Sequence, residues 1–551
     1  MTTIDITNIT GLSYPYDIYV CDIYGNNCIL LSTVFTNIPP SNTILLPPQF
    51  DTSASVGIKV ITLDGCERFK VINCYSVITP FISIWNTTNT SGGSSLSNQI
   101  QLPLVDSLPY HFNIDWGDGN IDTITSWNQP ETLHTYSTPG IYTLTISGYV
   151  PDWSFGASLV PDYEKILSIT QWGCLQFGVY ESLTFLNCVN LDLSSVVDIP
   201  NLSSPYISFD NVFSNCTSIT TINNLNNWDL SNVLVTIAMF AGCINFNQDI
   251  SNWDTSNIVN MNTMFENCTT FNSDISSWDM SNVTSISRMF RYAILFNQPI
   301  GTWDVSSVTT MYETFRGASS FNQNIDSWDV SNTTTMFGMF QSSSFNQPLL
   351  NWDVSSVTDM SYMFFFNTSF NQNLNLWNTS NVENMEGMFY FSYNFNGNIT
   401  SWDTSSVIDM QSMFAAATIF NQDISGWNVS GVTNMSYMFV GNSSFNQPIG
   451  SWDVSNVTTM YSMFGSGAFN QDIGSWDVSN VTNFSQFMYG KSFTDFSTTN
   501  LDAIYNGWSS LPSLNSGLSI NFGTIKYTAG GSAGKSILSG TYGWTITDGG
   551  I

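Results

Sequence analysis

Basic residues are scarce in this sequence. Lysine and arginine number 10 against 41 aspartates and glutamates, which gives a formal net charge of −31. Nucleic acids and anionic membranes are bound through clustered lysine and arginine, so this composition argues against both as partners. Only 9% of the residues are charged. The polar surface must therefore consist mainly of Ser, Thr, Asn, Gln and Asp.

The sequence also lacks long apolar runs and has little cysteine. No stretch approaches about 18 uninterrupted apolar residues, the length that spans a bilayer, so we expect no membrane insertion. The segment that starts at Met1 has no basic stretch followed by an apolar run, and we expect no secretory signal. Nine cysteines are too few for a disulfide scaffold. Pairing of Cys21 with Cys28 and of Cys66 with Cys74 is left open.

Histidine is scarce as well. The chain has only two histidines, His111 and His134, and no His-x-x-x-His pair. We therefore predict no catalytic, metal or cofactor residues and no enzymatic activity. A carbohydrate-active enzyme is the alternative, because the two carboxylates that cleave a glycosidic bond have no recognisable spacing in a sequence.

One sequence motif is repeated many times. It consists of Trp-Asp-Val-Ser-Asn-Val-Thr, then two methionines, the second of which is followed by Phe, and then Phe-Asn-Gln. It returns eleven times, in steps of 25 residues except for two steps of 24. Such a period predicts a solenoid, in which neighbouring coils stack because none can bury its apolar face alone. The tryptophans that mark it are Trp228, Trp253, Trp278, Trp303, Trp328, Trp352, Trp377, Trp402, Trp427, Trp452 and Trp476.

Spacing within one repeat predicts the shape of a coil. Val308, Met311 and Phe315 stand three and seven positions apart, as on one face of a helical or 3₁₀ turn. Phe321 and Ile325 share the parity of a strand. We therefore expect each coil to contain one short helical turn and one short strand.

About seven apolar positions per coil, filled by Val, Met, Met, Phe, Phe, Ile and Trp, are predicted to form the core. Each such side chain contributes on the order of 1.5 to 3 kcal/mol when it is buried. Cys216, Cys243 and Cys268 occupy one place in successive coils. Parallel side chains disfavour disulfide geometry, so we expect buried free thiols.

Two polar positions of the repeat predict hydrogen bonds. Asp follows nine of the eleven tryptophans, and Asn378 and Asn428 replace it after the other two. We interpret this residue as the acceptor of an Asx-turn, which Asn also makes; a calcium ladder is the alternative. The Asn of Phe-Asn-Gln recurs ten times between Asn247 and Asn470 and predicts bonds from coil to coil.

The segments around the repeats predict a mainly β, multi-domain chain with two small N-terminal β-sandwich modules and a solenoid capped at both ends. Runs of β-branched residues between turns favour strands in both modules. In the C-terminal segment, Leu501 to Trp508 reads as an amphipathic helix. The predicted units are residues 1–78 (docking), 79–148 (β-sandwich), 149–227 (irregular capping repeats), 228–490 (regular solenoid) and 491–551 (C-terminal cap).

Part of the second module resembles a known family. The stretch Phe112 to Gly119, then His134-Thr135-Tyr136 and Pro139 to Leu144, is similar to the PKD-like, immunoglobulin-type module. The resemblance implies an extracellular or virion-surface spacer without catalysis. Asp118, between two glycines, is interpreted as part of a hairpin turn, and His134 as a packed, hydrogen-bonded residue.

The repeats, over roughly residues 160–490, resemble the BspA-like branch of leucine-rich-repeat surface proteins, in which Met-Phe precedes a Gly/Ser/Cys loop and then Phe-Asn. The resemblance implies a right-handed, leucine-rich-repeat-like solenoid, found on bacterial cell surfaces and in viral and phage proteins and used for adhesion. Here Met and Phe replace many of the leucines, and the usual secretion signal is missing.

Recognition is expected at the positions that change from coil to coil. Exposed aromatic side chains there suit a host cell-surface glycan or a protein receptor, although some are expected to fill the core. The loops add further aromatics, among them Phe365, Phe366 and Phe391. The candidate binding surface consists of Tyr292, Tyr312, Phe337, Tyr362, Tyr390, Tyr393, Tyr437 and Tyr461.

The sequence thus predicts a non-enzymatic structural and adhesion protein, with a phage or other virion surface fibre preferred and a bacterial cell-surface adhesin as the alternative. Its N-terminal domain would attach it to other virion or surface proteins. Homo-oligomerisation is left open. No cofactor is predicted, apart from calcium in the alternative interpretation of the Asp positions.

Overall fold

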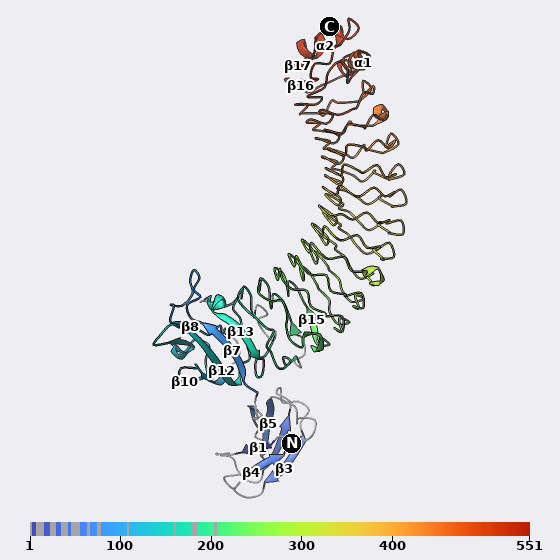
Figure 1. Cartoon of the computed structure of the whole chain (residues 1–551). Coiled ribbons are helices and arrows are strands. Elements are labelled where there is room, and N and C mark those ends of the chain that lie inside the picture. The colour runs from blue at the N-terminus through green and yellow to red at the C-terminus, as the bar shows by residue number, and fades with distance from the viewer. Residues whose placement is uncertain are drawn as a thin grey trace.

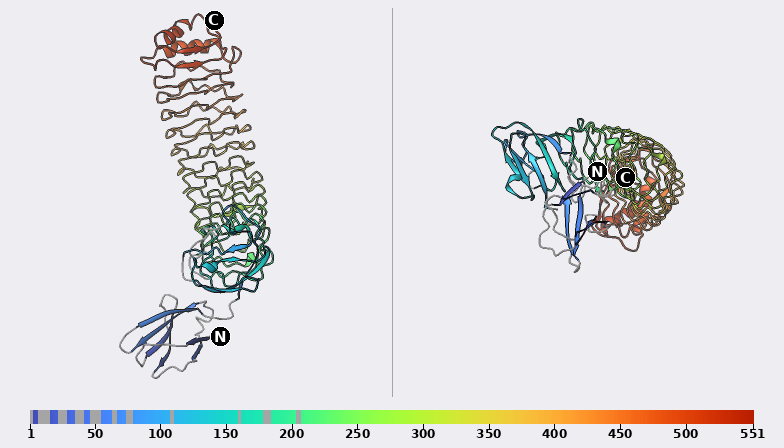
Figure 2. Two further views of the ribbon diagram at one scale, coloured as in Figure 1. Left: turned by 90° about the vertical axis from the view of Figure 1, so that its left-hand side faces the viewer. Right: turned by 90° about the horizontal axis from the view of Figure 1, so that it is seen from below.

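The computed structural model describes residues 79–106, 110–158, 161–177, 184–202 and 207–551, and the backbone of six strands before residue 79. Nearly all strands of regular length lie in the N-terminal part of the chain. A long, curved stack of repeating coils follows, with the C-terminus at its far end (Figure 1). Figure 2 shows the coils lying one above another along the stack.

The six strands before residue 79 pair antiparallel in two sheets. The four-stranded sheet has the order β3-β2-β5-β6, and β1 pairs with β4. The side chains of these residues lie outside the described part of the structure, so the pairing of the four N-terminal cysteines stays a prediction. The strands are β1 (Thr3–Ile6), β2 (Tyr16–Cys21), β3 (Ile29–Val34), β4 (Asn42–Leu45), β5 (Ser55–Thr62) and β6 (Glu67–Asn73).

The next unit is built from a five-stranded sheet of order β10-β9-β12-β7-β13 and a two-stranded sheet of β11 and β8. Alternate residues of β7 are buried, as expected of a strand with one face on a core. The elements are β7 (Phe81–Asn86), β8 (Gln99–Gln101), β9 (His111–Asp115), β10 (Ile121–Ile124), η2 (Pro130–Thr132), β11 (Leu133–Thr135), β12 (Ile141–Tyr149), η3 (Asp162–Glu164) and β13 (Ile166–Gln171).

The hairpin between β9 and β10 confirms the interpretation of Asp118 and His134. Asp118 accepts a hydrogen bond from the backbone N–H of Asn120, and Gly117 and Gly119 on either side have φ of 78° and 94°. The His134 ring stacks on Trp116 with centroids 4.6 Å apart, and its Nε2 lies 2.9 Å from the Asp118 carboxylate. This histidine is therefore packed and hydrogen-bonded.

Strand β13 joins the sheet to the first coils. It pairs antiparallel with β7, and its Ser168 forms a parallel bridge with Asp192 in the following coil. The buried core is correspondingly continuous from Phe81 to Trp544. The sequence predicts a boundary at residue 148 between the β-sandwich and the capping repeats. The hydrogen bonds of the sheet continue past this residue through β13.

The coils are connected by parallel bridges at one position of each repeat, just before the first methionine. The parallel pair β14 (Ile207–Ser208) and β15 (Val233–Val235) begins this series, and single bridges continue it from Val235 to Asn483. Short 3₁₀ turns occur at η4 (Leu225–Asn227), η5 (Ile300–Thr302) and η6 (Ile449–Ser451).

The segment after each bridge corrects the prediction of a helical turn. The N–H of Thr263 donates to the carbonyl of Ser287 in the next coil (2.9 Å), whereas the N–H of Glu266 donates back to Thr263 (3.0 Å). Bonds between coils thus alternate with bonds inside a coil. Thr263 and Asn267 have φ of 56° and 58°, and the matching positions of the other coils also have positive φ. A helix cannot form, because it requires negative φ at every residue.

The predicted strand at Phe-Asn-Gln is not formed in the described repeats either. The parallel bridge of the coil that contains Phe321 lies at Thr310 instead. In the Phe-Asn-Gln segment, most bonds between coils involve a side chain; Asn322 Oδ1 accepts from the N–H of Asn346, and Gln323 Nε2 donates to the carbonyl of Asn297. The prolines at 299, 348 and 448 are tolerated there because no backbone ladder needs their missing N–H.

Aromatic stacking fills the core of the coils. Phe340 and Phe364 of adjacent coils are parallel to within 15° with centroids 5.7 Å apart, and Trp352 and Trp377 are 6.3 Å apart. The predicted Val, Met, Phe, Ile and Trp positions are buried throughout the regular repeats. The core prediction is therefore confirmed in its residues.

The C-terminal segment closes the stack. Helix α1 (Thr498–Ser509) buries Leu501, Ile504, Tyr505 and Trp508 on one face, as predicted. Strand β16 (Ser519–Asn521) is bridged to Phe484 of the last regular coil and pairs with β17 (Thr545–Thr547), while α2 (Ser532–Gly540) packs on α1. Among the helices that the structure describes, none has the length and hydropathy needed to cross a bilayer.

Candidate binding surface

The tryptophan of each repeat is a structural residue. Trp352 is 2% exposed, and its indole N–H donates to the carbonyl of Ile325 in the preceding coil (3.0 Å). The same bond recurs in every coil from Trp253 to Trp476, and Trp508 of α1 continues it. Trp228, at the start of the series, is buried without a partner for its indole N–H. The repeated tryptophan is therefore not available for a ligand.

The aspartate after each tryptophan makes the predicted Asx-turn. Asp353 Oδ1 accepts from the N–H of Ser355 (3.0 Å), and hydrogen bonds from Ser355 hold the pKa of this carboxyl below its usual value. Asn378 and Asn428 accept the same bond, at 3.3 and 3.1 Å. Among the described residues, no group of three or more His, Cys, Asp or Glu side chains is placed to hold a metal ion.

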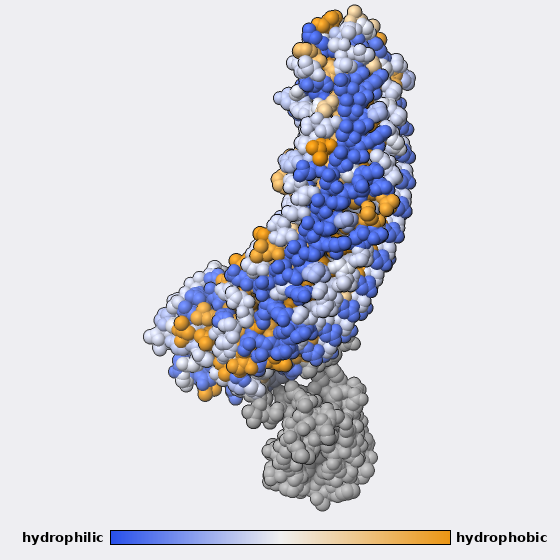
Figure 3. Space-filling view, turned by 45° about the vertical axis from the view of Figure 1, so that its right-hand side comes forward, coloured by the Kyte–Doolittle hydropathy of each residue, from blue (hydrophilic) through white to orange (hydrophobic). Residues whose placement is uncertain are grey.

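The asparagine of Phe-Asn-Gln forms the predicted ladder. The N–H of Asn371 donates to Asn346 Oδ1 (2.9 Å), and Gln372 Nε2 donates to the carbonyl of Asn346 (3.0 Å). The ladder ends at Asn470, which accepts from the N–H of Ser497. Figure 3 shows a continuous hydrophilic band along the coils on the face turned forward there.

The repeat cysteines are also structural. Cys216, Cys243 and Cys268 are fully buried free thiols, as predicted. The thiol of Cys243 donates to the carbonyl of Phe213 in the preceding coil (3.0 Å). Burial raises the pKa of all three thiols well above the usual value, which leaves them protonated and unreactive.

The predicted aromatic residues lie outside this scaffold. None of the eight is buried, and Tyr393 and Tyr437 are exposed at 37% and 38%. The expectation that some of them fill the core was therefore wrong. The positions around Met-x-x-Met-Phe alternate between side chains that enter the core and side chains that face outward, and the aromatics occupy the outward positions.

Six outward rings, four of them from the predicted set, form one continuous row of contacts across successive coils, here called the aromatic track. Neighbouring ring centroids along it are between 4.2 and 5.8 Å apart, and the first pair stacks in parallel at 4.6 Å. The track consists of Tyr312, Phe337, Tyr362, Phe365, Tyr390 and Phe391, with Phe366 and Tyr393 beside its C-terminal end.

The remaining predicted residues are not part of this row. Tyr437 and Tyr461 contact each other at 4.9 Å as a separate pair. The coil between this pair and the track has small residues, Ala415 and Ala416, directly after Met-Phe. Tyr292 instead lies beside the guanidinium groups of Arg291 and Arg316. The structure thus brings together five of the eight predicted residues.

Glycines in the following coil let two of the rings lie flat on the surface. A Cβ atom at Gly387 would lie 2.6 Å from Cε1 of Tyr362, and one at Gly317 would lie 2.3 Å from Cδ1 of Tyr292. Both distances are too short for any side chain. The absence of a side chain at these two positions therefore sets where Tyr362 and Tyr292 lie.

Polar groups flank the track. Glu386 accepts hydrogen bonds from the hydroxyl of Tyr362 and from Gln411 Nε2, and Gln411 Oε1 accepts from Asn434. Burial and the bond to Glu386 raise the pKa of the Tyr362 hydroxyl, which stays protonated. At the other end, the guanidinium carbon of Arg288 lies 5.0 Å from the centre of the Tyr312 ring. The track is thus an apolar strip between charged and amide groups.

Sequence reasoning missed the arginines at this end of the track. Arg291 and Arg316 are 25 residues apart, and Arg288 is three residues before Arg291. A separation of one repeat places two residues on the same face of adjacent coils. The spacing of one repeat between Arg291 and Arg316 was the sequence signal from which the arginine pair could have been predicted.

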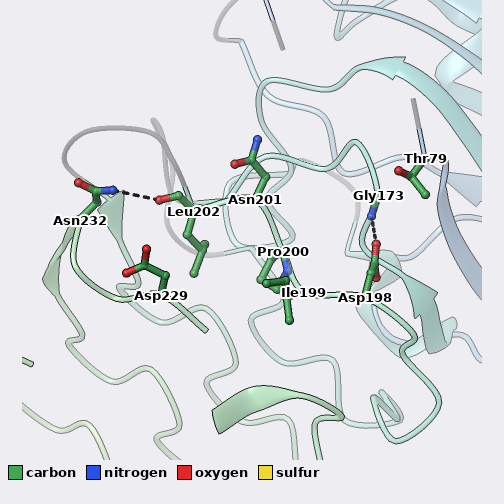
Figure 4. A pocket seen from close by; sticks show the side chains of 9 residues that line it. All are labelled: Thr79, Gly173, Asp198, Ile199, Pro200, Asn201, Leu202, Asp229 and Asn232. Carbon is green, nitrogen blue, oxygen red and sulfur yellow. Dashed lines mark hydrogen bonds between the residues drawn. The ribbon is translucent and has the colours of Figure 1, made fainter. Parts of the chain in front are cut away.

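A separate hollow of about 570 Å³ lies beside the first coils, lined by nine residues that include Asp198, Asn201 and Asp229 (Figure 4). Both oxygens of Asp198 accept backbone N–H bonds, from Trp172 and Gly173. Asp229 accepts from the N–H of Ser231 in its Asx-turn. These carboxylates are therefore used by the fold, and the hollow shows no arrangement of catalytic groups.

Fold and surface together define a repeat protein: a stack of 25-residue coils with a structural scaffold and variable outward positions. The chain belongs to the family described as Mycoplasma protein of unknown function, DUF285. The family model matches residues 207–326, 311–424 and 391–501, which together cover more than half of the chain. Comparison with curated proteins gives no match, and neither does comparison with solved structures.

Proposed function

We propose that this protein is a non-enzymatic adhesion protein whose coils are a leucine-rich-repeat-like solenoid of the BspA-like kind. The observation that carries the proposal is the aromatic track. Its rings occupy the positions that change between coils, and they contact one another across coils without entering the core. Aromatic side chains that remain half-exposed give a large contact area to a ligand at a low cost in conformational entropy.

Backbone conformation gives the track further support. Phe366 and Phe391 have φ of 55° and 56°, a conformation that costs a residue other than glycine roughly 1 to 2 kcal/mol. The corresponding positions two coils away are Gly317 and Gly441, which adopt this φ without strain. Other coils carry Ser342, Ala416 and Ser466 at this position with the same positive φ, so the backbone does not require an aromatic ring there.

The N-terminal units fit the role of attachment and spacing. In this proposal, residues 1–78 dock the protein to other surface or virion proteins. The sheet of β7, β9, β10, β12 and β13 is a PKD-like spacer that connects the docking unit to the coils. The support for the spacer is the continuous core that joins this sheet to the first coils.

Two locations fit an adhesion protein. The resemblances favour a virion surface, whereas the match to a family described from Mycoplasma favours a bacterial cell surface. Mass spectrometry of purified particles and of surface-shaved cells from the source material distinguishes them. Recovery of the chain only from the cell interior would contradict both.

The test of the proposed function uses the Phe366→Gly variant of the full chain. Fluorescently labelled protein is measured on intact host or tissue-culture cells by flow cytometry. Phe366 contacts the track residues Phe365 and Phe391. We expect wild-type protein to bind and the variant to bind roughly tenfold more weakly, the loss typical of one aromatic contact at an interface. Its melting temperature should be unchanged or raised, because glycine relieves the positive φ of a side chain that is 47% exposed.

The matched control is Tyr437→Ala, which removes an exposed ring outside the track and should leave binding unchanged. Equal binding by the wild type and Phe366→Gly would contradict the assignment of the track. The enzymatic alternative is tested by incubation with host polysaccharide. Turnover that a single Asp or Glu substitution abolishes would replace adhesion with catalysis.

A further inference from the structure

All arginines of the repeats lie in one cluster. Between Lys165 and Lys491 the chain contains no other basic residue than Arg288, Arg291 and Arg316, in a protein with a formal net charge of −31. The three side chains come from adjacent coils and share the carboxylate of Glu313. We call Arg288, Arg291, Arg316, Glu266 and Glu313 the arginine cluster.

The cluster is arranged around one buried acid. Glu313 has a side chain that is 2% exposed; it accepts from Arg288 Nε at 2.8 Å and from Arg316 Nη1, and Arg291 Nε lies 3.5 Å away. Arg291 Nη1 also donates to Glu266 at 3.1 Å. Burial opposes ionisation of Glu313, but the hydrogen bonds from Arg288 and Arg316 outweigh it and lower its pKa. Glu313 is therefore a charged anchor that orients the guanidinium groups.

The cluster carries one more positive than negative charge, and its guanidinium groups reach solvent. The side chain of Arg288 is 40% exposed, and those of Arg316 and Arg291 are 26% and 22% exposed. Arg288 donates to Glu313 through Nε and also lies against Tyr312, while its side chain remains partly exposed. A guanidinium fixed in this way can bind a carboxylate or a sulfate through two parallel hydrogen bonds.

The position of the cluster links it to the aromatic track. Arg288 lies against the ring of Tyr312, the first ring of the track. From the coil of Arg288 to the coil of Tyr390 there are four steps, or about 20 Å at the spacing of parallel strands. A ligand that contacts both is therefore extended along the stack and carries a negative charge at one end.

We infer that the ligand of the aromatic track is an acidic glycan, whose carboxylate or sulfate group is bound by Arg288 and Arg316 while its sugar rings lie on the track. This inference rests on the proposed function. Sugars fit a narrow apolar strip with polar margins, because a pyranose ring has an apolar face and hydroxyl groups at its edge. The carboxylate of Glu386 beside the track accepts bonds from Tyr362 and Gln411 through Oε1, which leaves lone pairs for these hydroxyls.

The experiment measures binding of the full chain to four immobilised probes by biolayer interferometry: hyaluronate, heparin, neutral dextran and poly-glutamate. We expect binding to hyaluronate if the bound group is a carboxylate and to heparin if it is a sulfate. Binding should weaken as salt is raised, and dextran should bind at least tenfold more weakly. Equal binding of dextran would overturn the inference, and binding of poly-glutamate without either acidic glycan would assign the surface to an acidic protein instead.

The variant is Arg288→Gln, and Lys526→Gln in the C-terminal cap is the control for the same change of net charge. Arg288→Gln should weaken binding of the acidic glycan by about tenfold or more, the loss of one charge-assisted hydrogen bond, while Lys526→Gln leaves it unchanged. Glu313 keeps Arg316 and Arg291 in this variant, and Arg288→Lys keeps the charge but not the paired donors. Equal effects of Arg288→Gln and Lys526→Gln on binding of the acidic glycan would overturn the inference.

Failure of this inference is distinct from failure of the proposed function. If Phe366→Gly reduces cell binding but the protein binds neither acidic glycan, adhesion through the track would stand. Only the identification of the ligand as an acidic glycan would then be wrong.

Discussion

At the scale of single residues, the repeat separates scaffold positions from surface positions. Each repeated polar residue has a defined hydrogen-bond partner. The Trp indole N–H donates to a carbonyl of the preceding coil, the Asp carboxylate accepts in an Asx-turn, and the Asn side-chain oxygen accepts from a backbone N–H of the next coil. A residue whose hydrogen-bonding groups are all used inside the fold has none left for a ligand. We therefore expect any ligand to be bound at the positions where the repeat changes.

The tryptophan bond gives a test with an internal control. Trp352→Phe removes the donor and leaves the buried carbonyl of Ile325 without its partner, which costs roughly 1 to 3 kcal/mol beyond the loss of apolar contact. Trp228→Phe removes an indole N–H that has no partner. In urea denaturation, we expect Trp352→Phe to lose more stability than Trp228→Phe. An equal loss in the two variants would show that the indole bond contributes nothing.

At the scale of the element, the junction between the last regular coil and the cap contains an unusual buried charge. Lys491 is 2% exposed and stands where other coils have Cys, Ala, Ser, Asn or Gly. Its Nζ donates to the carbonyls of Gly467 (2.6 Å) and Phe469 (2.8 Å) of the preceding coil. Burial lowers the pKa of Lys491 to about 8, because the charged form loses its hydration.

This pKa predicts a specific pH dependence. Below about pH 8 the ammonium is protonated in both the folded and the unfolded chain, so its burial penalty is constant. Between pH 8 and the ordinary value of 10.5 the unfolded chain binds more protons, and the folded state gains stability as the pH rises. The difference in unfolding free energy between wild type and Lys491→Met should therefore shift in favour of wild type from pH 8 to 10. A difference in unfolding free energy between the two proteins that does not change with pH would contradict this prediction.

At the scale of the whole molecule, stability depends on contacts between neighbouring coils and on the caps. Each coil contacts mainly the coil before and the coil after it, as the regular bridges from Asn260 to Asn483 show. The last coil would expose Phe484, Phe487 and Met488 without the cap, since α1 and β16 pack against these residues. Such a molecule can lose an internal coil more easily than an end.

Two deletions test this. Removal of residues 403–427 joins Trp402 to Asn428 in register, and we expect a folded, shorter protein with an unchanged aromatic track. Removal of residues 491–551 should produce aggregation or unfolding from the exposed end. Circular dichroism and size-exclusion chromatography measure both. A stable, monodisperse protein without the cap would contradict the role assigned to it.

Much of the fold and part of the surface followed from local pattern. The 25-residue period predicted stacked coils, the parity of apolar positions predicted the core, and the helix from Leu501 to Trp508 followed from its spacing. The interior of the coil was predicted wrongly as a helical turn and a strand. The spacing of Val308, Met311 and Phe315 is the same in a helix and in a chain of turns with alternating φ, so periodicity alone could not separate them.

The sequence by itself determined the period, the core residues, the hydrogen-bonding roles of Asp and Asn, and the aromatic residues that vary between coils. Only the tertiary structure decided which of those residues meet. Contacts along the track depend on ring directions, on the glycine at 387, and on the small residues Ala415 and Ala416 that follow it in the next coil. The arginine cluster likewise exists only when adjacent coils stack, because its charges are close in space through residues one repeat apart in the chain.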